Sequence, residues 1–280
     1  MSLSALKETI NLLTRIPILW LPGFVCGALA AFLWLVLTTS GTFFAGRLLI
    51  IFSLVGLFFI IGMVAALQKK GSTFKDMLAD GARYYFRVLL PTLVVAFSIV
   101  LVFILVILTL TLFGLTLDAG LLTFLVFGVL LPTVILTFFY DTAVIFEGKK
   151  VFESLERSIE VVTANLGEVI LFFAGCLLIF CSVSFAMMII WSAFLADHLE
   201  PITRYNETQL QSFTPDQLIG MIGQDGVWIT ALIIFCWIAL LIPVLYTYKA
   251  CFYRLVSGKI VQQVQQQVGE FDSKGRWYKY

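Results

Sequence analysis

Few residues of this 280-residue chain have side chains that could do chemistry, and they are scattered. The single histidine, His198, has no neighbouring cluster of cysteines or carboxylates with the spacing of a zinc site. The sequence contains no glycine-rich phosphate loop, no nucleophile elbow and no paired-histidine metalloprotease motif. Basic residues do not alternate with aromatic residues on any polar stretch, which argues against a nucleic-acid partner. We therefore expect no enzyme activity, no cofactor and no metal site, and we expect His198 to be a surface residue.

Asp141 stands out because it lies near the end of a long apolar run, seven residues before Gly148. An ionisable side chain inside a bilayer is costly, so such a residue is by default a hypothesis for a functional site. One interpretation is that Asp141 is a ligand for an ion or a substrate. The other is structural: Asp141 pairs with Arg157 or caps the helix that follows. We favour the structural role because no second acid lies within an apolar run.

Long apolar runs are the elements that must position these residues. Hydrophobic residues make up 61% of the chain and charged residues only 12%, about half the charged fraction of soluble domains. A helix needs about twenty apolar residues to cross a hydrocarbon core of ~30 Å. Six runs are long enough, and none has the recurring polar face of a helix in a soluble protein. The six runs are residues 18–37, 48–67, 89–113, 121–145, 169–195 and 228–248.

The basic residues predict how these runs are oriented. Sixteen of the eighteen Lys and Arg residues fall in the two ends of the chain and in the connections 69–88 and 147–167, whereas Arg47 and Arg204 fall in the other connections. Lys and Arg accumulate on the cytoplasmic side of a membrane. We therefore expect a multi-pass protein of the cytoplasmic membrane with both termini cytoplasmic. The external connection 196–227 contains the pattern Asn206-Glu207-Thr208, an acceptor for glycosylation where the machinery exists.

A charged segment with a continuous apolar stripe interrupts the runs three times. In the third copy the stripe is spaced by 3, 4, 3 and 4 residues, which predicts an amphipathic helix. The first copy has the same spacing 149 residues earlier, and the middle copy has it with a register that could shift by one residue. The stripes are Leu3, Leu6, Ile10 and Leu13; Phe74, Met77, Gly81, Tyr84 and Val88; and Phe152, Leu155, Ile159, Val162 and Leu166.

Each amphipathic segment precedes two apolar runs, so the chain predicts three repeats of one unit. The expected fold is all-α: six transmembrane helices in one domain, residues 1–250, with repeats at 2–68, 72–146 and 150–250 and a tail at 251–280. An amphipathic helix beside a span lies in the membrane interface, with its stripe toward acyl chains or toward the helix bundle. The alternative is a solvated connecting helix with no special role.

Residues 141–173 carry a resemblance to a known family. An acid near the end of a span, a Glu-Gly turn, an amphipathic helix with Arg-Ser and a later Asn resemble the superfamily that includes the membrane domain of glycerophosphoryl diester phosphodiesterases. The matching residues are Asp141, Glu147, Gly148, Arg157, Ser158 and Asn165. In the phosphodiesterase relatives catalysis belongs to a separate soluble domain, which we expect this chain to lack. The resemblance therefore implies a fold and a structural motif rather than an activity.

The middles of the apolar runs bear on transport. Four of them contain no charge, amide or hydroxyl, and the other two contain Thr133, Ser182 and Ser184. A channel must offer polar groups to its permeant species across the bilayer. We therefore expect a non-enzymatic scaffold, assembly factor or lipid-interacting subunit, whose partners are membrane lipids, another membrane protein or a second copy. The alternative is a passive channel or facilitator for a small neutral or hydrophobic solute.

Overall fold

The computed structural model is helical almost throughout, and it describes residues 2–69, 73–114, 119–201, 206, 214–267, 270–271 and 277–278. Two short antiparallel strands, β1 (Glu270–Phe271) and β2 (Trp277–Tyr278), are the exception to the expected all-α fold within these residues. Five helical stretches are long and apolar enough to cross a membrane, as the composition predicts. They are Pro17–Lys69, Phe74–Leu112, Gly120–Glu147, Leu166–Phe194 and Gln217–Gly258.

The first two predicted runs lie in one helix that folds back on itself. After α1 (Ser2–Arg15) and the short η1 (Pro17–Trp20), α2 extends over Leu21–Lys69. Gly41 breaks α2 with φ 78° and ψ 177°, a conformation open to glycine because it lacks a Cβ. Beyond the break the two halves pack together, with the ring centroids of Phe32 and Phe52 6.0 Å apart. Six predicted runs therefore occupy five long helical stretches.

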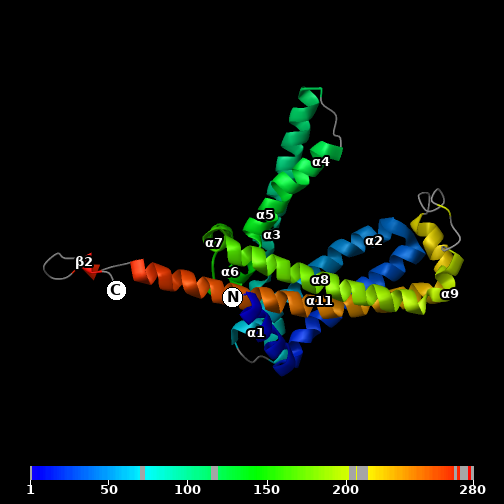
Figure 1. The fold of residues 1–280 in the computed structure, drawn as a ribbon, viewed down its shortest axis with the longest axis horizontal. Coiled ribbons are helices and arrows are strands. Elements are labelled where there is room, and N and C mark those ends of the chain that lie inside the picture. Colours follow the sequence, from blue (N-terminus) through cyan, green and yellow to red (C-terminus); the bar gives the residue numbers. More distant parts are fainter. Residues whose placement is uncertain are drawn as a thin grey trace.

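The third and fourth runs form an arm that points away from the other long helices (Figure 1). We call residues 92–114 and 119–137 the arm. The rest of the chain buries little of its outer part. Large apolar side chains are exposed on both helices of the arm. Its elements are α3 (Phe74–Leu112), α4 (Ala119–Leu125), the π-helical η2 (Val126–Leu130) and α5 (Leu131–Thr137).

The remaining elements complete a bundle with α2. Figure 1 shows α8 and α11 side by side, and α2 packs against α11. Indole nitrogens join these helices: Trp237 donates to the hydroxyl of Ser184 at 3.0 Å, and Trp191 donates to that of Thr230 at 2.9 Å. The elements are α6 (Tyr140–Glu147), α7 (Val151–Ala164), α8 (Leu166–Phe194), α9 (Ala196–Leu199) and α11 (Pro215–Gln267), which is broken at Gly223.

The core lies where three helices converge. Residues 60–67 of α2, 142–145 of α6 and 247–253 of α11 are buried without interruption. We call these three stretches the junction core. Apolar clusters join them to each other and to α1, α7 and α8. The boundary predicted at residue 250 falls inside this core, and α11 continues through it to Gln267.

Helices α1 and α7 bury the same face at the predicted offset of 149 residues. Each presents a small-residue face to the junction core, and part of each apolar stripe is exposed: Leu3 is 82% exposed and Phe152 is 74% exposed, whereas Leu13 and Val162 are buried. The middle copy differs, because it is the beginning of α3 rather than a separate helix and it buries three of its five stripe positions. The buried positions are Ala5, Thr9 and Leu13 on α1; Ser154, Ser158 and Val162 on α7; and Met77, Gly81 and Val88 on α3.

Candidate functional site

A break in the helical backbone between α5 and α6 positions Asp141. The backbone N–H of Phe139 donates to the hydroxyl of Ser158 at 3.0 Å, and that hydroxyl donates to the carbonyl of Leu136 at 2.8 Å. Ser158 is fully buried on α7. Unpaired backbone groups in an apolar interior are costly. One hydroxyl on a neighbouring helix satisfies two backbone groups at the break. The break in turn starts α6 at the depth that places Asp141 in its first turn.

Asp141 pairs with Lys249 of α11, with 2.8 Å between Lys249 Nζ and Asp141 Oδ2. The other carboxylate oxygen accepts from the backbone N–H of Thr142 at 2.7 Å. Both charged side chains are mostly buried, at 9% exposed for Lys249 and 14% for Asp141. The predicted pairing of Asp141 with Arg157 is therefore wrong. Asp141 is paired with a cation of α11, a helix distant in sequence, and Arg157 is engaged by Glu147 and Glu160.

Arg157 instead pairs with two other acids. Its Nε lies 3.0 Å from the carboxylate of Glu147, and its Nη1 lies 2.8 Å from that of Glu160. Burial lowers the pKa of the guanidinium, but hydrogen bonds and charges from Glu160 and Glu147 outweigh this effect and raise the net pKa. Glu147 also accepts from the hydroxyl of Tyr253 at 2.6 Å. Glu147 thus ties α6, α7 and α11 together.

The remaining motif residues shape the ends of these helices. Gly148 follows α6 with φ 67° and ψ 20°, a left-handed helix end that favours glycine. Asn165 separates α7 from α8, and its amide donates to the carbonyl of Val161 at 3.2 Å. All six residues of the predicted motif therefore lie along α6, α7 and the turns that flank them. In this part of the chain these residues end helices, satisfy backbone groups and hold α6, α7 and α11 together.

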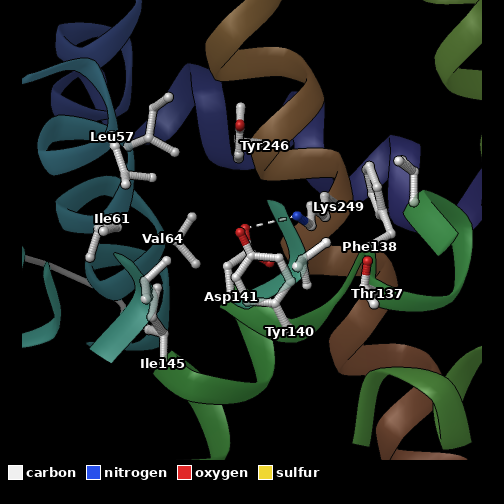
Figure 2. Close-up of a pocket in the computed structure, with 14 residues that line it drawn as sticks. Leu57, Ile61, Val64, Thr137, Phe138, Tyr140, Asp141, Ile145, Tyr246 and Lys249 are labelled. Carbon is white, nitrogen blue, oxygen red and sulfur yellow. Dashed lines mark hydrogen bonds and ion pairs between the residues drawn. The ribbon is translucent and has the colours of Figure 1, made fainter. Parts of the chain in front are cut away.

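A cavity of about 240 Å³ opens between α2, the arm and α11, with the ion pair of Asp141 and Lys249 at its floor. Figure 2 shows both charged side chains pointing toward each other inside it. The ammonium of Lys249 lies 4.2 Å from the centroid of the Phe138 ring, a distance at which a cation is attracted to an aromatic face. The remaining lining is Leu57, Ile60, Ile61, Val64, Val88, Val95, Val134, Thr137, Tyr140, Ile145 and Tyr246.

Metal chemistry finds no support in the part of the chain that the structure describes. No group of three or more His, Cys, Asp or Glu side chains is arranged there to hold a metal ion.

His198 was expected at the surface, but it is half-buried in α9. The glycosylation pattern begins at Asn206, which is exposed, and its Glu207 and Thr208 lie outside the described residues.

Lys249 and Tyr253 are the residues of this site that sequence reasoning missed. Lys249 follows the last apolar run directly, so its position in the sequence indicates a residue of the basic tail. The apolar runs contain the missing signal, since Asp141 and Lys249 each lie near the end of an apolar run that leads into a basic segment. Under the predicted topology these two ends lie on the same side of the membrane, and so at similar depth. An acid and a base at equal depth are candidates for a pair.

Comparison with known proteins places the chain in a family without assigning an activity. No curated protein and no solved structure matches it. The relation to the membrane domain of glycerophosphoryl diester phosphodiesterases stays a prediction. Residues 2–256, which include α1, the junction core, the arm and the Asp141–Lys249 pair, match the family described as a domain of unknown function, DUF7847. The chain therefore belongs to the DUF7847 family.

Proposed function

We propose that this chain is a non-enzymatic, multi-pass protein of the cytoplasmic membrane that acts by contact, as a scaffold, an assembly factor or a lipid-interacting subunit. In this proposal the two halves of α2 each cross the membrane, so the five long helical stretches provide six spans. The distribution of basic residues supports a cytoplasmic location of both termini. The small-residue faces of α1 and α7, matched at an offset of 149 residues, support the proposed repeat.

The arm is the observation that carries the proposal. Its helices expose apolar side chains on several sides, including Phe97 at 68% and Phe127 at 64%. In the stretch Phe74–Leu112, no residue of the most apolar window is buried within the chain. Exposed apolar surface of this extent marks an interaction site. In a membrane such a surface contacts lipid or the helices of another protein.

Two of the three hydroxyls near the middles of the runs are engaged within the protein. Thr133 donates to the carbonyl of Val129 of its own helix at 2.7 Å, and Ser184 accepts from the indole of Trp237 on α11. A hydroxyl that bonds to its own backbone offers little to a permeant species. This arrangement favours contact over the alternative, a passive channel or facilitator.

Photo-crosslinking in cells tests the contact function directly. A photoreactive amino acid replaces Phe97 on the arm in one variant and Phe24 on α2 in the control, because both side chains are at least half exposed. We expect the arm variant to form a discrete protein adduct, with a second copy or another membrane protein, or to be enriched in lipid adducts relative to the control. Equal, non-specific labelling at both positions would contradict a contact role for the arm.

Reconstitution tests the alternative function. We expect purified protein in liposomes to conduct no ions and to pass no small neutral solutes faster than empty vesicles do. A reproducible flux that Thr133→Trp abolishes would replace the contact proposal with the channel. Thr163→Trp is the matched control, because Thr163 is exposed on α7 and bonds to its own helix in the same way.

A further inference from the structure

We propose that the cavity between the arm and the bundle binds the headgroup of a zwitterionic phospholipid of the phosphoethanolamine type. This inference deepens the proposed function and rests on it, since it names one lipid class for a protein that acts by contact in the membrane. Asp141, Lys249 and Tyr246 are the residues that would hold the headgroup.

The shape of the cavity suits an amphiphile. Its walls are aliphatic, with Leu57 and Val64 of α2 on one side and Val95 and Val134 of the arm on the other. Val134 is 41% exposed, so this wall continues into the apolar surface of the arm, where an acyl chain can lie. Figure 2 shows the Asp141–Lys249 pair inside the cavity, with the α2 side chains Leu57, Ile61 and Val64 to one side of it. A headgroup at the floor and a chain along the wall match this division.

The charges at the floor favour a ligand with both signs of charge. The Asp141–Lys249 pair is neutral as a whole, and both side chains are more than four-fifths buried. A net anion would meet the carboxylate of Asp141, and a net cation would meet the ammonium of Lys249. A phosphate beside an ammonium can instead contact Lys249 and Asp141 at once, without adding a net charge to a poorly solvated site.

The floor also has hydrogen-bond donors to spare. An ammonium has three donors, and Lys249 uses one of them on Asp141 at 2.8 Å. Tyr246 lines the same cavity, and the ammonium of Lys249 lies 5.6 Å from the centroid of its ring. The hydroxyl of Tyr140 is engaged by Thr92 at 2.7 Å. Lys249 and Tyr246 therefore border the same part of the cavity, where the phosphate would sit.

Native mass spectrometry of the full chain in detergent tests this assignment. The protein is titrated with dioleoyl phosphatidylethanolamine and, in parallel, with dioleoyl phosphatidylglycerol, which carries the same phosphate and chains without the amine. We expect one saturable phosphatidylethanolamine adduct whose dissociation constant is roughly tenfold lower than that for phosphatidylglycerol.

Removing both charges together separates binding from folding. The double variant Asp141→Asn/Lys249→Met leaves no unpaired charge, so we expect it to fold and to lose the preference for phosphatidylethanolamine. The matched control is Asp80→Asn/Lys69→Met, which removes a pair with 2.6 Å between its charged atoms that does not line the cavity. This control keeps the preference. Should the first double variant fail to fold, Val134→Trp fills the cavity from its exposed wall and has the same expected result.

The outcomes distinguish the site from the function. A preference for phosphatidylglycerol, equal binding of both lipids, or a preference that survives in both cavity variants overturns the proposed site. None of these results affects the arm crosslinks or the absence of flux, on which the contact function stands. A loss of preference confined to the cavity variants supports the site.

Discussion

The junction core and the arm are both mostly apolar, yet the junction core is buried and the arm is exposed. Residues 60–67, 142–145 and 247–253 are buried without interruption. The arm, equally apolar, is mostly exposed. Hydrophobicity therefore does not decide what is buried here. Three features in and beside the junction core do: small residues that let helices approach, a backbone break that Ser158 satisfies, and a buried ion pair between α6 and α11.

The difference indicates where stability and where function lie. A membrane offers no hydrophobic driving force between helices, so packing and polar contacts hold them together. These contacts are concentrated at the junction core and around the root of the arm. The outer arm has few of them and is available to lipid or to another protein. We expect stability to depend on the junction core and contacts in the membrane to depend on the arm.

Truncating one aromatic side chain in each region gives the largest expected contrast. Phe172 is fully buried, with ring centroids 4.6 Å from Phe252 and 4.7 Å from Tyr248. We expect Phe172→Ala to lower the free energy of unfolding by about 3–5 kcal/mol. We expect Phe97→Ala on the arm to change it by less than about 0.5 kcal/mol. Unfolding in detergent, followed by circular dichroism, measures both. Equal losses in the two variants would contradict the comparison.

The buried ion pair gives the next largest effect. Asp141→Asn leaves Lys249 without its partner in a poorly solvated site, at an expected cost of about 3 kcal/mol or more. Combining it with Lys249→Met should cost less than the sum of the single changes. Combining it with Arg157→Ala should cost close to the sum, because Arg157 pairs with Glu147 and Glu160 instead. Additivity with Lys249 and coupling with Arg157 would show that the pairing is the reverse of that in the structure.

The sequence predicts the periodic features of this molecule well. Apolar runs of about twenty residues gave the long helices, and the 3–4 spacing gave α1 and α7 with an offset of 149 residues. These features are local, so they can be recognised from composition and periodicity alone. Two predicted runs lie in one helix that is interrupted at Gly41, because the connection between the runs is helical on both sides of this residue.

The partners of the charged residues are not local, and here the prediction failed. Arg157 is near Asp141 in sequence, but Lys249 is 108 residues away and pairs with it. The orientation of α1 and α7 was left open by the sequence, since an apolar stripe can face acyl chains or the helix bundle. In the structure Ala5, Thr9 and Ser158 face the core, and part of each stripe is exposed. In a membrane small residues at an interface permit close packing, and large apolar ones can face lipid. A stripe alone does not distinguish these two sides.

Close helix approach in the bundle provides a smaller test of the same comparison. A Cβ on Gly23 of α2 would lie 2.4 Å from the carbonyl oxygen of Ala239 on α11. We expect Gly23→Ala to destabilise the protein by about 1–3 kcal/mol through overpacking. Gly46→Ala is the matched control, since a Cβ there meets nothing within 4 Å. We expect the control to be neutral or slightly stabilising. Thermal unfolding in detergent resolves the two, and a destabilised control with an unaffected Gly23→Ala would contradict the α2–α11 packing.

The two ends of α3 give the smallest expected contrast. At its start, Thr73 accepts from the backbone N–H of Asp76 at 3.3 Å and donates to the Asp76 carboxylate at 2.7 Å. At its far end, on the arm, the Thr111 hydroxyl bonds only to the carbonyl of Ile107. We expect Thr73→Ala to cost about 1 kcal/mol through loss of the helix cap. We expect Thr111→Ala to be close to neutral, because it removes no contact between elements.

Acid titration shows whether the cap works through the Asp76 carboxylate. Hydrogen bonds from the side chain and backbone of Thr73, with the charges of Lys69 and Lys75, lower the pKa of Asp76. A carboxyl whose pKa is lower in the folded state stabilises that state above its unfolded pKa, and the contribution is lost as the pH falls through the folded pKa. The difference in melting temperature between the wild type and Thr73→Ala should therefore persist from pH 7 to about pH 5 and narrow only below about pH 4. A difference that disappears already between pH 7 and 6 would show that another titrating group, and not Asp76, supports the start of α3.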